Sequence, residues 1–168
     1  ILDHPQKEWE DKEAIICEPI NVNEIKKLKM IKRGYKSLIK NPLPLFFKSK
    51  RTIKFHFDMH HGYGNIDKAI DVLNKNDRSD FREFVNYNYS FNPHIMFISK
   101  SKIMNQWFEN LFDWLFECEK IFGFKGLDGY DTTRLYAYLA ERYLSFWFRK
   151  YTKSLEWKWI FYESKDFN

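Results

Sequence analysis

The chain has 168 residues, of which 44% are hydrophobic, 20% aromatic and 30% charged. This composition is typical of one soluble globular domain. The content of only six glycines and five prolines excludes collagen-like, low-complexity and wholly disordered chains and disfavours a many-stranded barrel or sandwich. The net charge is +5, and no stretch approaches the ~18 uncharged apolar residues of a membrane-spanning helix.

The N-terminal part predicts a short strand followed by a helix. Residues 14–20 are apolar and predict a buried strand that Pro19 ends. Residues 23–39 predict a basic helix with Asn23 as its cap. The apolar residues of this helix recur at helical spacing: Ile25, Leu28, Ile31, Tyr35 and Leu38.

Residues 26–54 carry charge of one sign. The segment contains 11 basic residues and no acidic residue, whereas the rest of the chain has 17 basic and 23 acidic residues. Such a block favours an anionic partner: a phosphate-bearing small molecule, an anionic membrane surface or nucleic acid. The alternative is a solvated face whose counter-charges come from elsewhere in the fold. Within this block, residues 42–47 are apolar, and they either pack inward or form an exposed element that touches a membrane or a partner.

The middle of the chain predicts short elements of both kinds. Residues 52–58 alternate between apolar and polar and predict a strand. Residues 67–73, with Asn65 as cap, and residues 80–87 predict two short helices. The apolar run 95–98 predicts another buried strand.

Two long helices are predicted near the C-terminus, over residues 101–122 and 131–150, and a closing strand over 155–162. Short strands that alternate with helices indicate an α/β or α+β fold, with a small sheet and a heavy helical share. Residues 1–168 are expected to form a single domain. Cys17 and Cys118 fit no disulfide or zinc framework and are expected to be buried free thiols in a reducing compartment.

Two groups of residues are candidates for chemistry. If the strand continued to residue 60, His56, Asp58 and His60 would share one face and could hold a divalent metal, although ordinary hydrogen-bonded polar residues are the preferred interpretation. His60 and His61 precede a Gly-Tyr-Gly loop, where backbone freedom suits ligand contact.

The second group lies where a glycine loop meets the last long helix. Asp131 can cap that helix, or Asp131 or Asp128 can act as a general base at the mouth of a pocket. Farther along, Arg134, Glu141 and Arg142 form either a helix-to-core ion pair or a fork that holds a phosphate or carboxylate.

Residues 134–144, RLYAYLAERYL, resemble the "R-hydrophobic-FGF-small-ER-LL" helix of an uncharacterised bacterial domain family. Three further pieces follow the order of that family. Residues 15–19 resemble its "D-hydrophobic-ILP" strand, residues 60–67 its "HH…DL" segment, and residues 94–98 with 114–116 its "NMFI…WLF" block. The similarity spans about residues 14–150.

That family is common in capsule, exopolysaccharide and lipopolysaccharide gene clusters and is generally treated as glycosyltransferase-like. The resemblance implies a GT-A-like fold. The family's N-terminal half, with its His-Tyr-Arg-Arg motif, has no counterpart here, so the chain is expected to be the C-terminal, acceptor-side part of a larger enzyme. The family's glutamine before the arginine helix is replaced by Asp131-Thr132-Thr133. No clear Asp-x-Asp motif is present, which leaves the need for a divalent cation (Mn²⁺ or Mg²⁺) open.

The leading hypothesis is therefore a cytoplasmic glycosyltransferase, or part of one, that acts on a nucleotide sugar and a carbohydrate acceptor in bacterial surface polysaccharide synthesis. It could be peripheral at the inner membrane, and nucleic acid is not expected as a partner. Asp131, with Asp128 as the alternative, would be the base. Five residues would bind substrate: His60, His61, Arg134, Glu141 and Arg142. The alternative is a non-catalytic module that binds an anionic membrane or a polyanion through residues 26–54.

Overall fold

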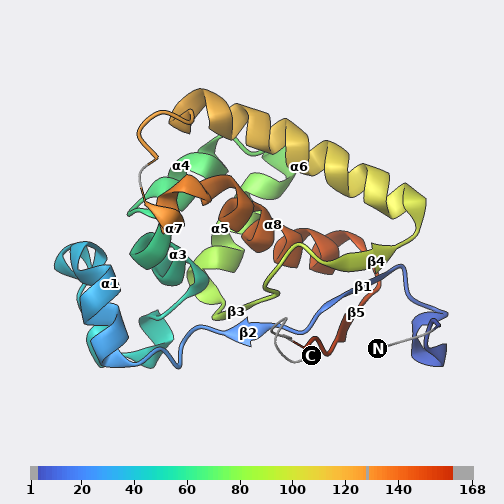
Figure 1. Ribbon diagram of the computed structural model, residues 1–168, viewed down its shortest axis with the longest axis horizontal. Helices are drawn as coiled ribbons and strands as arrows, with labels where there is room; N and C mark the ends of the chain where they lie inside the picture. The colour runs from blue at the N-terminus through green and yellow to red at the C-terminus, as the bar shows by residue number, and fades with distance from the viewer. Residues whose placement is uncertain (1–3, 128, 161–168) are drawn as a thin grey trace, which may run out of the picture.

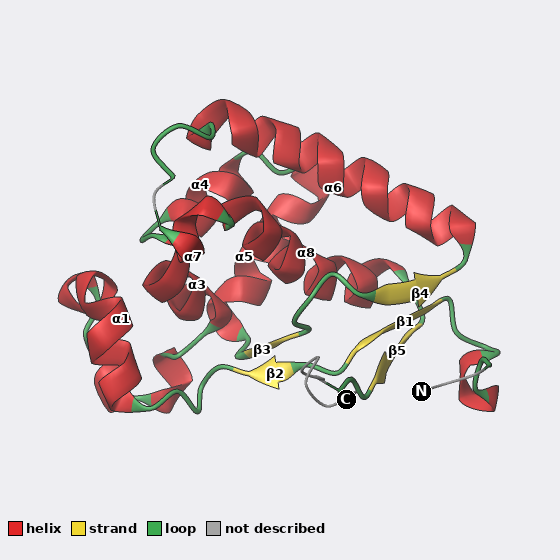
Figure 2. Cartoon of the chain, in the orientation of Figure 1, coloured by secondary structure: helices red, strands yellow, loops and turns green. Residues whose placement is uncertain are grey.

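The fold is of the α/β or α+β class: helices surround a central helix at one side of a small mixed sheet (Figure 2). The computed structural model describes residues 4–127 and 129–160. Its α-helices are α1 (Lys27–Lys40), α2 (Leu43–Phe46), α3 (Ile53–His61), α4 (Asn65–Asp71), α5 (Lys75–Tyr87), α6 (Ser101–Phe122), α7 (Tyr130–Thr133) and α8 (Leu135–Tyr151). Two short 3₁₀ turns cover Lys7–Trp9 and Lys48–Lys50.

Strand β1 (Ala14–Cys17) is the centre of a three-stranded sheet. It pairs antiparallel with β4 (Phe97–Ser99) and parallel with β5 (Ser154–Trp157). All four of its residues are buried, which confirms the predicted strand. A separate two-stranded ribbon joins β2 (Ile20–Asn21) to β3 (Ser90–Phe91). The predicted strand over 95–98 is present as β4, but Ile98 is exposed because β4 lies at the edge of the sheet.

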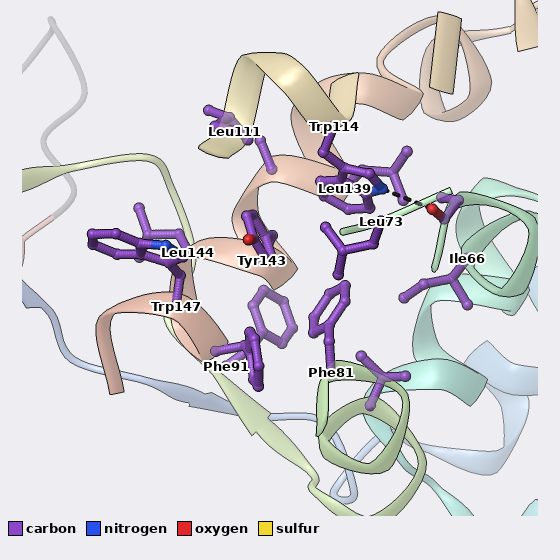
Figure 3. Close-up of a cluster of buried hydrophobic side chains, with 14 of the residues drawn as sticks. Ile66, Leu73, Phe81, Phe91, Leu111, Trp114, Leu139, Tyr143, Leu144 and Trp147 are labelled. Atoms are coloured by element: carbon purple, nitrogen blue, oxygen red, sulfur yellow. Dashed lines mark hydrogen bonds between the residues drawn. The ribbon is translucent and has the colours of Figure 1, made fainter. Parts of the chain in front are cut away.

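Helix α8 lies at the centre of the hydrophobic core. It packs against α3, α5 and α6, and it runs in the opposite direction to α6 across the molecule (Figure 1). Aromatic side chains fill the core, among them Phe81, Trp114 and Tyr143 (Figure 3). The indole N–H of Trp114 donates to the carbonyl of Ala69 at 2.7 Å, which satisfies a polar group that would be costly to bury alone. Much of the aromatic excess therefore serves packing.

The predicted strand over 52–58 is wrong, because these residues begin helix α3. Thr52 caps the helix by accepting from the backbone N–H of Phe55. The alternating pattern arises because α3 is buried on two sides. Ile53 and Phe57 belong to the main core, whereas Phe55 and Met59 belong to a second cluster against α1. Two buried faces on one helix produced the same period of two as one buried face of a strand.

Helix α1 is present, but it buries a different face from the one that its apolar spacing indicated. The buried residues are Met30, Gly34, Ser37 and Leu38. Gly34 permits this contact, since a Cβ at this position would lie 2.5 Å from Cγ of Met59. Asn23 does not cap the helix, whose N-cap is Lys26 without a side-chain hydrogen bond. The apolar residues Leu28, Ile31 and Tyr35 remain exposed.

The other predicted elements are present with shifted bounds: the helices over 67–73 and 80–87 are α4 and α5, and the closing strand is β5. Asn65 does not cap α4, whose N-cap is Gly64. The helix over 101–122 is present as α6 with the same bounds. The helix expected from residue 131 is divided at Arg134 into α7 and α8. Cys17 and Cys118 are free and buried, and burial raises the pKa of Cys17 to about 11 and that of Cys118 to about 12. In the described part of the chain, no helix is both long and apolar enough to cross a membrane.

Candidate functional site

Helices α3, α7 and α8 bring the predicted site residues together. The C-terminal half of α3 carries His56, His60 and His61, and it packs against α7 and α8. We call these three histidines, together with Asp131, Glu141 and Arg142, the histidine–arginine cluster. The members of this cluster come from positions up to 86 residues apart, as in the pair of His56 and Arg142.

His61 is the structural member of the cluster. Only 3% of its surface is exposed, and its ring stacks on that of Tyr138 with centroids 3.9 Å apart. Its Nδ1 lies 3.0 Å from the backbone carbonyl oxygen of Asp131. Burial and the positive charge of Arg142 lower the pKa of His61 to about 3, so its ring is neutral at pH 7. A neutral ring with Nδ1 protonated donates to that carbonyl and holds α7 against α3.

Arg142 lies at the base of the cluster and is 1% exposed. Its Nη1 donates to Oε2 of Glu141 at 2.7 Å, and its Nη2 lies 3.2 Å from Nδ1 of His56. Its guanidinium stacks over the ring of Phe91 at 3.9 Å. Burial lowers the pKa of Arg142 to about 10, opposed by Glu141, so the side chain keeps its charge at pH 7.

The Nε of Arg142 has no hydrogen-bond partner among the described residues. Glu141 is engaged on both oxygens, since its Oε1 accepts the backbone N–H of His94 at 3.3 Å. The sequence-based choice between a helix-to-core ion pair and a ligand-binding fork is therefore partly answered. The ion pair is present, between Glu141 and Arg142, and it leaves one buried donor of the guanidinium free.

His60 and Asp131 lie at the accessible side of the cluster, and both are half-buried. Burial lowers the pKa of His60 to about 4; the Asp131 carboxylate opposes this shift, and the cations Lys29 and Arg33 of α1 add to it. The Asp131 carboxylate and these two exposed cations are therefore close enough to His60 to change its pKa. Asp131 lies in the first turn of α7, after the N-cap Gly129, so the prediction that its side chain caps the long helix is wrong. Gly129 has φ 85°, and the turn that it makes starts the helix one residue before Asp131.

Arg134 is exposed beside the cluster, at the junction between α7 and α8. Its guanidinium lies over the rings of Tyr130 and Tyr138, with distances of 5.0 and 5.6 Å to their centroids, and it donates to the hydroxyl of Tyr130. The two tyrosine rings restrict the direction of the guanidinium, and the side chain remains exposed to solvent. Asp128, the alternative base, lies outside the described residues.

A protein-family profile described as a domain of unknown function, DUF4422, matches residues 11–153. The chain belongs to the DUF4422 family. The matched region contains β1, β4, every helix from α1 to α8 and all members of the histidine–arginine cluster. No curated protein and no solved structure shows a significant match to the chain.

The DUF4422 fold does not assemble the metal site that a strand would have made. On helix α3, His56 and His60 are neighbours, with ring centroids 4.8 Å apart, whereas Asp58 points elsewhere. The Asp58 carboxylate accepts the backbone N–H of Gly64 at 3.0 Å and pairs with Lys54 at 3.3 Å. Within residues 4–127 and 129–160, no three His, Cys, Asp or Glu side chains are grouped so that they could hold a metal ion. The described residues therefore do not form a site that fits a divalent cation.

A cleft of about 650 Å³ opens on the opposite face of α3 from the cluster, between α1 and α5. Its lining includes Lys54, Asp58, Tyr63 and Arg82. Sequence reasoning missed this cleft because it treated residues 52–58 as a strand. The spacing of Lys54 and Asp58, four residues apart and of opposite charge, is a helical feature that could have corrected the interpretation. The two cations of this lining already form ion pairs: Lys54 pairs with Asp67, and Arg82 pairs with Asp67 and Asp71.

Proposed function

We propose that this DUF4422 chain is the acceptor-side part of a glycosyltransferase. The enzyme would transfer a sugar from a nucleoside diphosphate to a carbohydrate hydroxyl in bacterial surface polysaccharide synthesis, in the cytoplasm. The proposal starts from the four sequence segments that resemble the glycosyltransferase-like family. Two of them, the His60-His61 segment and the arginine-containing helix, meet in the histidine–arginine cluster although they are far apart in the sequence. The GT-A-like character of the fold is part of this proposal.

The observation that carries the proposal is the balance of charge at the cluster. Lys29 and Arg33 are exposed cations that lower the pKa of His60, Arg134 is exposed over the ring of Tyr138, and Arg142 is a buried cation at the base of the cluster. Glu141 is already paired with Arg142, so Asp131 is the remaining carboxylate among the cluster members. An excess of cations around a half-buried site favours a ligand with several negative oxygens, such as a diphosphate.

Asp131 is suited to the role of base. Its carboxylate accepts no hydrogen bond from the described residues, and it lies at the accessible side of the cluster. In the transfer, the acceptor oxygen forms a bond to the anomeric carbon of the donor sugar while its proton passes to Asp131. The bond from that carbon to the phosphate oxygen breaks, and the nucleoside diphosphate leaves with the electron pair. The nearby arginine and lysine cations stabilise the charge that develops on the leaving group.

Binding of nucleotide sugars to the protein encoded by the full open reading frame tests this proposal. We expect calorimetry with a panel of uridine and guanosine diphosphate sugars to identify a donor. His60→Ala should weaken its binding about tenfold, because one polar contact to a charged oxygen is lost. His4→Ala is the matched control, because His4 is exposed and is 56 residues from His60 in the sequence. This variant should bind the donor as the unmodified protein does. If no member of the panel binds or is hydrolysed, or if both variants bind equally well, the cluster is not a donor site.

The non-catalytic alternative predicts a different result in the same experiments. A module that only docks on an anionic surface would neither transfer nor hydrolyse any sugar donor. It would still bind its surface through the basic segment 26–54. Sugar transfer that is lost in His60→Ala but retained in His4→Ala would exclude this alternative.

A further inference from the structure

Helix α1 has three distinct faces, of which only one is packed. The buried face contacts α3 through Met30, Gly34, Ser37 and Leu38. A second, apolar face is exposed to solvent and consists of Leu28, Ile31, Tyr35 and Ile39. Leu28 and Ile39, at the two ends of this stripe, are 75% and 78% exposed. The helix lies at one end of the molecule, away from the core formed by α5, α6 and α8 (Figure 1).

The third face of α1 is basic and adjoins the apolar stripe. It carries Lys29, Lys32, Arg33, Lys36 and Lys40, all exposed. Three of the 11 basic residues of the segment are engaged elsewhere: Lys48 pairs with Glu24, Lys54 pairs with Asp58 and Asp67, and Arg51 bonds backbone carbonyls. In contrast, none of the five on α1 forms an ion pair within the part of the chain that the structure describes. Other residues of the fold therefore compensate only part of the positive charge of segment 26–54.

Helix α2, which packs against α1, extends the exposed apolar surface. Pro44 is buried and Leu45 packs against the second hydrophobic cluster. The next two side chains, Phe46 and Phe47, remain exposed, Phe46 at 73%. The segment 42–47 thus does both things that its sequence suggested, because Pro44 and Leu45 pack inward while Leu43, Phe46 and Phe47 face solvent.

We propose that α1 and the Phe46-Phe47 pair form a docking surface for an anionic phospholipid membrane. A helix with an apolar face beside a lysine-rich face lies in the plane of a membrane, with the apolar side chains below the headgroups and the cations among the phosphates. This inference does not depend on the proposed transfer reaction.

Other occupants fit the surface less well. A second copy of the chain would bring two basic faces together, and like charges repel. A nucleic acid or another polar polyanion would neutralise the lysines but leave the apolar stripe in water. The membrane is the partner that satisfies both faces at once.

Helix α6 provides an internal comparison. It carries a second exposed apolar row, in which the rings of Phe112 and Phe116 are neighbours with centroids 6.3 Å apart, and Phe116 is 60% exposed. An acidic residue follows each of these rings, Asp113 and Glu117. An anionic membrane repels this row and attracts α1, so the two rows separate the contribution of charge from that of apolar exposure.

Vesicle flotation of the full chain at about 0.1 M salt, where charges act over ~10 Å, tests the proposal. The probe is vesicles of phosphatidylcholine and phosphatidylglycerol in equal amounts, compared with phosphatidylcholine alone. We expect the protein to float with the anionic vesicles only and to be released at about 1 M salt, where the screening length falls to ~3 Å. Leu28→Gln with Ile39→Gln should weaken binding at least about tenfold by removing buried apolar area. Lys32→Gln with Lys36→Gln should weaken it roughly fivefold for each charge.

Phe112→Gln with Phe116→Gln is the matched control and should bind as the unmodified protein does. All four positions at which apolar residues are replaced are exposed, so circular dichroism should show unchanged helix content. The proposal is overturned if the unmodified protein does not float with anionic vesicles, or if it floats equally with neutral ones. It is also overturned if the α1 and α6 variants lose binding alike. Self-association that the α1 variant abolishes, without flotation, would assign the stripe to a second copy instead.

Discussion

The ring of His61 stacks on the ring of Tyr138, with 3.9 Å between their centroids, and this contact ties α3 to α8. This contact distinguishes His61 from the adjacent His60, although the two histidines look equivalent in the sequence. His61 faces inward and holds the helices together, whereas His60 lies half-buried at the accessible side of the cluster. A double substitution of both residues would confuse loss of stability with loss of binding.

His61→Ala should therefore reduce stability more than His60→Ala does. The first change removes a stacked ring and a hydrogen bond to the Asp131 carbonyl, for an expected loss of about 1–3 kcal/mol. The second change should cost under about 1 kcal/mol, because the His60 ring is partly in solvent. Urea unfolding of the two variants measures both values. An equal or reversed order would show that His61 does not hold α3 against α8.

The pKa values of these histidines predict how stability depends on pH. Burial, the main cause for both rings, lowers the pKa of His61 to about 3 and that of His60 to about 4, from an ordinary value of about 6.5. At pH values between the pKa of each histidine in the folded protein and its pKa in the unfolded chain, the unfolded chain therefore binds more protons than the folded protein does. Stability should be fully present above pH ~6.5 and fall as the pH drops toward these folded values.

His61→Gln should flatten this dependence, since glutamine does not titrate. Urea unfolding at several pH values between about 4 and 7 measures the slope. His4→Gln is the control and should leave the slope unchanged, because His4 is exposed. A slope that is the same in His61→Gln as in the unmodified protein would mean that His61 is not kept neutral by the fold.

Asp131→Asn tests the proposed base. The change keeps the size of the side chain and removes its ability to accept a proton, so turnover should fall by about 10²-fold or more. Stability should be nearly unchanged, because Asp131 does not cap a helix and its carboxylate accepts no hydrogen bond from the described residues. Asp113→Asn, on the exposed side of α6, is the control for loss of one carboxylate. Unchanged sugar transfer in a folded Asp131→Asn protein would remove Asp131 from the mechanism.

Gly34→Ala should destabilise the protein even though alanine favours helices. A Cβ at this position would lie 2.5 Å from Cγ of Met59, so the Met59 side chain or α1 itself must shift, at a cost of about 1–3 kcal/mol. Thermal unfolding measures the loss. In a double-mutant cycle, Met59→Ala should remove most of the cost of Gly34→Ala, because the smaller side chain leaves room for the methyl group. Additive effects would mean that the two residues do not set the distance between the helices.

The sequence by itself determined the class of the fold and its most regular elements. Helix α6 was predicted with its bounds because its apolar residues repeat at helical spacing over 22 residues and are buried on one side only. Strand β1 was predicted because a short apolar run ended by Pro19 is typical of a buried strand. The two cysteines were correctly expected to be free and buried, from their apolar surroundings and their separation.

Only the tertiary structure decided which faces of α1 and α3 are buried, and therefore where the cluster and the docking surface lie. A periodic pattern reports that apolar residues recur, but it does not report how many sides of a helix are buried. Helix α3 is buried on two sides, so Ile53 and Phe55 point into different clusters and imitate the alternation of a strand. On α1, the missing side chain of Gly34 allowed α3 to pack on a face that the apolar spacing did not mark, and Leu28 was left in solvent.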